Sequence, residues 1–208
     1  MKSESSALSL PFGTVLLAAF LWFVTFFLPW GVFWFKISFS AALLAAIALH
    51  QRPPLRRLFR FDLRSMFLGL ASAVVLYLIF WLGKLVSTAL FPFAQQQIGA
   101  IYGKGEGTPM WMIALLLFFV TGPCEEIYWR GFLQQTLSRH FGGWQGWLLA
   151  TGIYAGVHVW SLNFMLIGAA GVAGAFWGLM YWRLQDLRPV IISHALWSTF
   201  VFAAVPIP

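Results

Sequence analysis

Two carboxylates and a guanidinium interrupt an otherwise apolar stretch in the second half of the chain. Glu125, Glu126 and Arg130 follow an apolar run over residues 110–120, and apolar sequence resumes at Trp144. This placement puts the charges at membrane depth rather than in a long soluble loop. Charged groups are costly in hydrocarbon and usually mark functional sites there. The stretch is therefore the first candidate for a site that works by acid–base chemistry.

The spacing within this stretch separates the roles of its two carboxylates. Glu126 and Arg130 are four residues apart, so on a helix they share a face and can form a charged pair. Glu125 is rotated away from that face and has no local partner. We therefore predict that Glu125 is the general base.

Two histidines in later apolar segments are the other candidates for chemistry. Tyr154 and His158 are four residues apart, as are His194 and Ser198, so each pair shares a helix face. The histidines can meet Glu125 only by tertiary packing, where an imidazole can donate to a developing oxyanion or share an activated water. Polar groups at this depth also serve as hydrogen-bonding glue between helices. We rank that alternative second, because glue does not require so much buried charge.

The composition predicts an all-α, polytopic transmembrane bundle with the active site inside it. The chain has 208 residues, of which 61% are hydrophobic and 9% charged, whereas soluble domains carry about 25% charged residues. A spanning helix takes about 20 apolar residues, so there is room for about seven spans. We expect these spans at about residues 10–29, 32–50, 66–91, 110–138, 144–160, 164–182 and 189–205.

Basic residues are unevenly distributed between the two predicted sides of the membrane. One side carries Lys2, Arg52, Arg56, Arg57, Arg60, Arg64, Arg139, Arg183 and Arg188. The other carries Lys104, in a glycine-rich segment, residues 102–109, that we expect to be a mobile non-cytoplasmic loop. The positive-inside rule then predicts an N-terminus inside and a C-terminus outside. The net charge of +7 is explained by topology and does not indicate a nucleic-acid partner.

The chain divides into N-terminal spans over residues 1–109 and a candidate catalytic core over residues 110–208. The basic segment 51–64 is either an amphipathic piece on an anionic leaflet or a cytoplasmic loop that only fixes orientation. The single cysteine, Cys124, excludes an intramolecular disulfide. Its position beside Glu125 suggests a thiol protease, but a lone cysteine in an apolar helix is more often a packing residue.

The ordered motifs resemble the CPBP family of intramembrane proteases, also called the ABI family. The resemblance rests on Glu125-Glu126-x-x-x-Arg130, on an aromatic residue shortly before His158, and on His194 with a polar residue four positions on. It covers about residues 110–205. The family includes the CAAX prenyl endopeptidases and bacterial relatives linked to bacteriocin processing and self-immunity.

The resemblance implies roles for the matching residues. Glu125 would activate water with His158, while His194 and Ser198 would stabilise the tetrahedral oxyanion and the charged pair four residues apart would shape the site. The chain departs from the family at two positions, having Tyr154 where Phe is usual and Ser198 where Asn or Asp is usual. The second departure puts the oxyanion role of position 198 in doubt, because a hydroxyl is a shorter donor than an amide.

A metal-dependent mechanism is the alternative within the same family. Glu125, His158 and His194 could form a catalytic zinc triad with an open position for water. The chain has no H-E-x-x-H helix, however, and resemblance to the CAAX endopeptidases implies a metal-free glutamate mechanism. We favour no cofactor, with zinc as the alternative.

The sequence thus predicts an endopeptidase that hydrolyses a membrane-anchored protein or peptide precursor within the lipid bilayer. Small size and short loops indicate the cytoplasmic (inner) membrane of a bacterium. A non-proteolytic immunity or scaffold protein with the same fold is the second hypothesis, motivated by Ser198. A proton-coupled transporter is the third, since buried Glu and His can relay protons. The cleavage sequence and the oligomeric state are not specified by the sequence.

Overall fold

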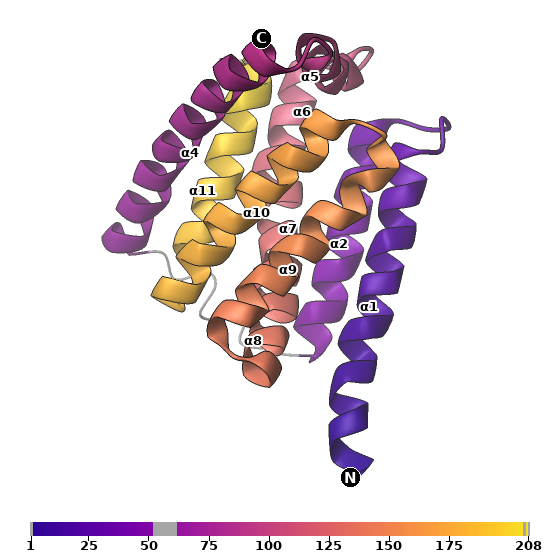
Figure 1. Ribbon diagram of the computed structural model, residues 1–208, viewed down its shortest axis with the longest axis vertical. Coiled ribbons are helices and arrows are strands. Elements are labelled where there is room, and N and C mark those ends of the chain that lie inside the picture. Colours follow the sequence, from indigo (N-terminus) through magenta and orange to yellow (C-terminus); the bar gives the residue numbers. More distant parts are fainter. Residues whose placement is uncertain (1, 52–61, 206, 208) are drawn as a thin grey trace.

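The described part of the chain is a bundle of helices without strands (Figure 1). The computed structural model describes the backbone of residues 2–51, 62–205 and 207, and side chains from residue 12 onward within these ranges. The helices are α1 (Lys2–Phe26), α2 (Phe33–Gln51), α4 (Leu63–Leu90), α5 (Ala94–Tyr102), α6 (Met110–Leu116), α7 (Gly122–Glu126), α8 (Gln135–Phe141), α9 (Gly143–Val157), α10 (Phe164–Leu184) and α11 (Arg188–Thr199). The prediction of an all-α membrane bundle is confirmed.

Four helical stretches of the described chain are long and apolar enough to cross a bilayer. They are Phe33–Gln51, Leu63–Leu90, Met110–Phe141 and Phe164–Leu184, and the shorter segment Phe12–Phe26 is also apolar. The two remaining predicted spans begin with α9 and α11, which continue as a 3₁₀ turn and a π-helical turn respectively. Every predicted span is therefore helical in the described residues, with α9 and α11 as the shortest.

The 32-residue stretch Met110–Phe141 is continuous but not a regular α-helix. Two π-helical segments, Leu117–Thr121 and Ile127–Gln134, flank the short helix α7 that carries both glutamates. Pro123 lacks the N–H that a regular helix would use here, and the Gly122 N–H bonds the Leu117 carbonyl five residues back. Such π turns are frequent at functional sites because they re-aim the side chains that follow.

Gly122 also brings α7 and α11 into close contact. A Cβ at this position would lie 3.0 Å from the Ala195 Cα and 3.1 Å from its backbone nitrogen. Most Cβ contacts are longer than this, so any residue but glycine would require the neighbouring backbone to shift by a few tenths of an ångström. The close approach places His194, the residue before Ala195, beside the glutamates.

A similar close contact, between Gly146 of α9 and Ser138 of α8, should contribute to stability. A Cβ at Gly146 would overlap the backbone of Ser138, whereas the exposed Gly152 on the same helix has open space around it. We expect Gly146→Ala to lose about 1–3 kcal/mol through overpacking. The control Gly152→Ala should be neutral or gain up to about 1 kcal/mol of helix propensity. Unfolding of both variants in the same detergent measures the difference, and equal stabilities would contradict the packing described here.

The helix α5 lies just before the glycine-rich segment 102–109, which contains a short 3₁₀ turn, Gly103–Gly105. Helix α5 is held to the start of α10 by hydrogen bonds. The Asn163 side chain donates to the Gln97 carbonyl at 2.8 Å, and the Met165 N–H donates to Gln97 Oε1 at 3.0 Å. Of the basic segment 51–64, residues 52–61 lie outside the described residues.

Lys36 caps the end of α1. Its ammonium donates to the Leu28 carbonyl at 2.7 Å and to the Val24 carbonyl at 3.2 Å. The last carbonyls of a helix have no partners within the helix, and a lysine can satisfy them. Lys36 thus fixes the turn between α1 and α2.

Candidate active site

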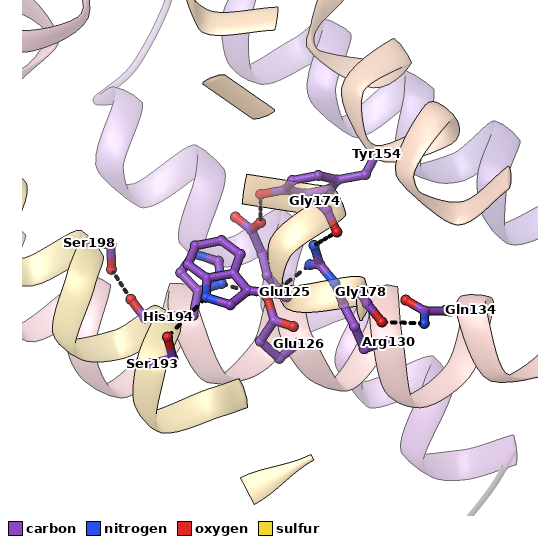
Figure 2. A network of polar contacts seen from close by, with 11 residues as sticks. Glu125, Glu126, Arg130, Gln134, Tyr154, Gly174, Gly178, Ser193, His194 and Ser198 are labelled. Atoms are coloured by element: carbon purple, nitrogen blue, oxygen red, sulfur yellow. Dashed lines mark hydrogen bonds and ion pairs between the residues drawn. The ribbon is translucent and has the colours of Figure 1, made fainter. Parts of the chain in front are cut away.

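Glu126 is the centre of a buried polar network (Figure 2). Its Oε1 accepts hydrogen bonds from Arg130 Nη1 at 2.8 Å and from His194 Nδ1 at 2.7 Å. Glu126 is 0% exposed, Arg130 2% and His194 6%. The i, i+4 ion pair expected from the sequence is therefore present, and a histidine 68 residues away in the chain shares it.

Arg130 is held by more than its carboxylate partner. Its Nη2 donates to the Gly174 carbonyl at 3.3 Å, and its guanidinium lies over the rings of Tyr154 and Trp177, 4.8 Å and 5.6 Å from their centroids. A Cβ at Gly174 would lie 2.9 Å from the Tyr154 ring. Gly174 therefore allows α10 to pack close to Tyr154, and its carbonyl lies within hydrogen-bonding distance of Arg130.

Glu125 points to a different partner from its neighbour. Its Oε2 accepts a hydrogen bond from the Tyr154 hydroxyl at 2.8 Å, and the side chain is 5% exposed. The two adjacent carboxylates thus have different partners, as their helical phase suggested. The sequence did not identify Tyr154 as the partner, although its position on one face with His158 placed it near the site.

Removal of the Tyr154 hydroxyl should weaken the site without disrupting the fold. Phe at this position keeps the ring beneath Arg130 but leaves Glu125 Oε2 without its donor. A hydrogen bond to a charged group contributes about 1.5–3 kcal/mol, so we expect cleavage to fall roughly tenfold, which corresponds to about 1.4 kcal/mol. Rates for native and Tyr154→Phe protein in the same liposomes test this. An unchanged rate would show that the hydroxyl does not support Glu125.

The contacts of His194 define its tautomer. A carboxylate only accepts, so Nδ1 carries the proton donated to Glu126, and Nε2 is the nitrogen left for other partners. The Trp177 ring stacks on the imidazole with centroids 3.9 Å apart and planes 17° apart, and its indole N–H bonds Ser193 Oγ at 3.1 Å. His194 is therefore held on one edge by a carboxylate and on one face by an indole.

His158 has partners at both ring nitrogens. Nδ1 donates to the Tyr154 carbonyl at 2.7 Å, and Nε2 accepts from Trp22 Nε1 at 3.3 Å. Trp22 belongs to α1, is 0% exposed, and lies outside the predicted catalytic core. No sequence signal distinguishes this indole from the other tryptophans of the spans.

Ser198 uses its hydroxyl within its own helix. The hydroxyl donates to the His194 carbonyl at 2.8 Å, four residues back, rather than to either glutamate. The structure therefore joins Glu126, Arg130 and His194 directly. It places His158 beside Tyr154, which bonds Glu125, and leaves Ser198 as a neighbour of the site through the backbone.

A cavity of about 400 Å³ reaches this network. Tyr154, His158 and His194 lie on its wall, and Lys84 and Ser87 contribute further polar groups. The remaining lining is mostly apolar and aromatic, including Phe80, Phe91, Phe164, Trp177, Trp197 and Phe202. The cavity can therefore hold an apolar segment beside the polar network.

The residues considered for zinc do not fit a metal site in this arrangement. Both nitrogens of His158 are engaged, by the Tyr154 carbonyl and the Trp22 indole, and Glu125 Oε2 is bonded to the Tyr154 hydroxyl. Among the described residues, no group of three or more His, Cys, Asp and Glu side chains is placed to hold a metal ion. No step of the mechanism is therefore assigned to zinc.

Comparison with known protein families gives a match in the C-terminal half of the chain. Residues 107–200 match the family model described as type II CAAX prenyl endopeptidase Rce1-like. The matched region contains both glutamates, Arg130, both histidines and Ser198, and it excludes α1, α2 and α4. The searches of curated proteins and of solved structures found no match.

Proposed function

We propose that the chain hydrolyses a peptide bond of a membrane-anchored protein or peptide precursor, and the match of residues 107–200 to the Rce1-like endopeptidase family supports this proposal. The observation that carries this proposal is the placement of Glu125. It is a buried carboxylate bonded to Tyr154, whose ring lines a cavity shared with two histidines from separate parts of the bundle. A water molecule that enters the cavity would meet two imidazoles on its wall, and Tyr154 on the same wall is bonded to the candidate base Glu125.

In the proposed reaction Glu125 takes a proton from this water as its oxygen attacks the carbonyl carbon of the scissile bond. The carbonyl π electrons move to oxygen and form an oxyanion. As the intermediate collapses, the C–N bond breaks and Glu125 returns its proton to the leaving amine. The Tyr154 hydroxyl holds Glu125 in place throughout.

The histidines have distinct proposed roles. His194 can donate to the oxyanion from Nε2 only as an imidazolium, since Nδ1 already carries the proton donated to Glu126. The Glu126 carboxylate stabilises that charged form, as a carboxylate does in acid–base triads. His158 can bind the attacking water through Nε2 once a water molecule has displaced the Trp22 indole from that nitrogen. The Trp22 bond of 3.3 Å is longer than the usual N–H donor distance of about 2.9–3.0 Å.

A comparison of protein termini tests the proposed activity and identifies the substrate. Membranes from cells carrying the native chain should contain new termini that are missing from cells carrying equal amounts of folded Glu125→Gln. Addition of a strong chelator to purified membranes should leave their formation unchanged, because we propose a mechanism without metal. Identical termini in both strains, under conditions where the gene has an effect, would contradict proteolysis.

A non-proteolytic immunity or scaffold role is the second candidate. Two observations favour it, since the Ser198 hydroxyl is bonded within its helix and both nitrogens of His158 have partners. If cells carrying Glu125→Gln are protected as fully as cells carrying the native chain, this second function replaces the first.

A further inference from the structure

The cavity lies toward one end of the bundle. Its lining residues come from 79–91 of α4, 98–102 of α5, 164–177 of α10, the stretch from His194 to Ile207, and Tyr154 and His158 at the end of α9. Among the described residues, α4 before Ile79, α9 before Tyr154 and α10 after Trp177 contribute none. The cavity therefore extends from the polar network toward the end of the bundle where α5 lies (Figure 1).

A second cavity adjoins α5 at the same end. It measures about 350 Å³, and Ile98, Tyr102 and Phe202 line both cavities. The helix α5 is thus bordered by cavities rather than packed tightly into the bundle. It is held mainly at two points, through Gln97 to the start of α10 and through Tyr102, whose hydroxyl accepts from the Ile207 N–H at 2.9 Å.

The basic residues of the chain gather at the other end. That end holds the described residues Arg64, Arg139, Arg183 and Arg188, which lie where α4 begins, where α8 and α10 end and where α11 begins. In sequence, Arg52, Arg56, Arg57 and Arg60 fall between α2 and α4, and Lys2 is the first residue of α1. The α5 end has Lys36, Lys84 and Lys104, and Lys36 is bound to the carbonyls of α1.

The distribution of basic residues indicates which side of the membrane the cavity faces. The positive-inside rule places arginine-rich short connections in the cytoplasm, so the α5 end faces away from it. We propose that the site is loaded from the non-cytoplasmic half of the membrane, under α5. Its substrate is a protein or peptide, already inserted or exported, whose scissile bond lies in or just beyond that half. The assignment of a substrate rests on the proposed proteolysis, whereas the sidedness does not.

Cysteine labelling in intact cells tests the sidedness without any substrate. In a Cys124→Ala background, single cysteines are placed at Gln96 on α5, at Gly168 on the cavity wall, and at His140 at the basic end. The first and last are exposed, and Gly168 has open space around it. A membrane-impermeant maleimide should label positions 96 and 168 in intact cells and position 140 only after permeabilisation. Labelling of position 140 alone in intact cells would overturn the proposal.

A paired reporter then tests the substrate class. The cleavable segment found from the native termini is fused to anchors of opposite orientation, so that it lies outside in one fusion and in the cytoplasm in the other. Only the outside fusion should be cut, and its cutting should be lost with Glu125→Gln. Cutting of the cytoplasmic fusion alone would overturn the proposed loading side. Failure to find any native-specific termini would instead refute the proteolysis, while the labelling result would still stand.

Discussion

Glu125→Gln is expected to fold normally and to reduce peptide-bond hydrolysis by roughly 10²–10⁴-fold, the usual contribution of a general base. The amide has the shape of the carboxylate, and its oxygen can still accept the Tyr154 hydroxyl, so the packing around position 125 is preserved. What it loses is the ability to take a proton from water. Cleavage rates of purified native and variant protein in liposomes measure the effect.

The matched control for this loss is Glu106→Gln. Glu106 is exposed in the connection before α6 and does not line the cavity that reaches the network around Glu126. Its neutralisation removes one carboxylate from the chain and should leave the rate unchanged. If the two variants lose activity equally, or if neither does, Glu125 is not the base.

Arg130→Met should cause the largest loss of stability. The substitution leaves the fully buried Glu126 without its charged partner and also removes the contact with the Gly174 carbonyl. Removing one partner of a buried ion pair typically costs about 3–5 kcal/mol. The double variant Glu126→Gln, Arg130→Met removes both charges, so it should recover part of this loss. Thermal unfolding in one detergent measures both variants.

Arg183→Met is the matched control for the buried arginine. Arg183 is exposed near the end of α10, and its guanidinium lies over the neighbouring Trp182 ring with 5.2 Å to the centroid. Exposed substitutions of this kind usually change stability by no more than about 0.5 kcal/mol. An Arg130→Met protein as stable as Arg183→Met would contradict the account of a buried, mutually dependent pair.

The local part of this architecture could be predicted from the sequence. Apolar runs of spanning length located the helices, because the bilayer sets their length and composition. The pairing of Glu126 with Arg130 followed from their spacing, and the different direction of Glu125 followed from helical phase. These features depend only on residues within a few positions of one another.

The long-range part could not be predicted, because packing between helices determines it. The bond from His194 to Glu126 depends on the close contact of Gly122 with Ala195. The contact of Trp22 with His158 joins residues 136 positions apart, and one indole in an apolar span carries no local signal. The π turns around α7 reflect Pro123 and tertiary contacts rather than a recognisable repeat.

The central claim, that Glu125 directs water against a peptide bond, is tested most directly by a cleavage reaction in water enriched in ¹⁸O. Purified protein in liposomes is given the substrate found from the native termini, and the new C-terminal carboxylate is examined by mass spectrometry. The account predicts one ¹⁸O atom in that carboxylate with native protein and little or no cleaved fragment with Glu125→Gln. Fragments that form without ¹⁸O, or labelled fragments in equal yield from the variant, would contradict it.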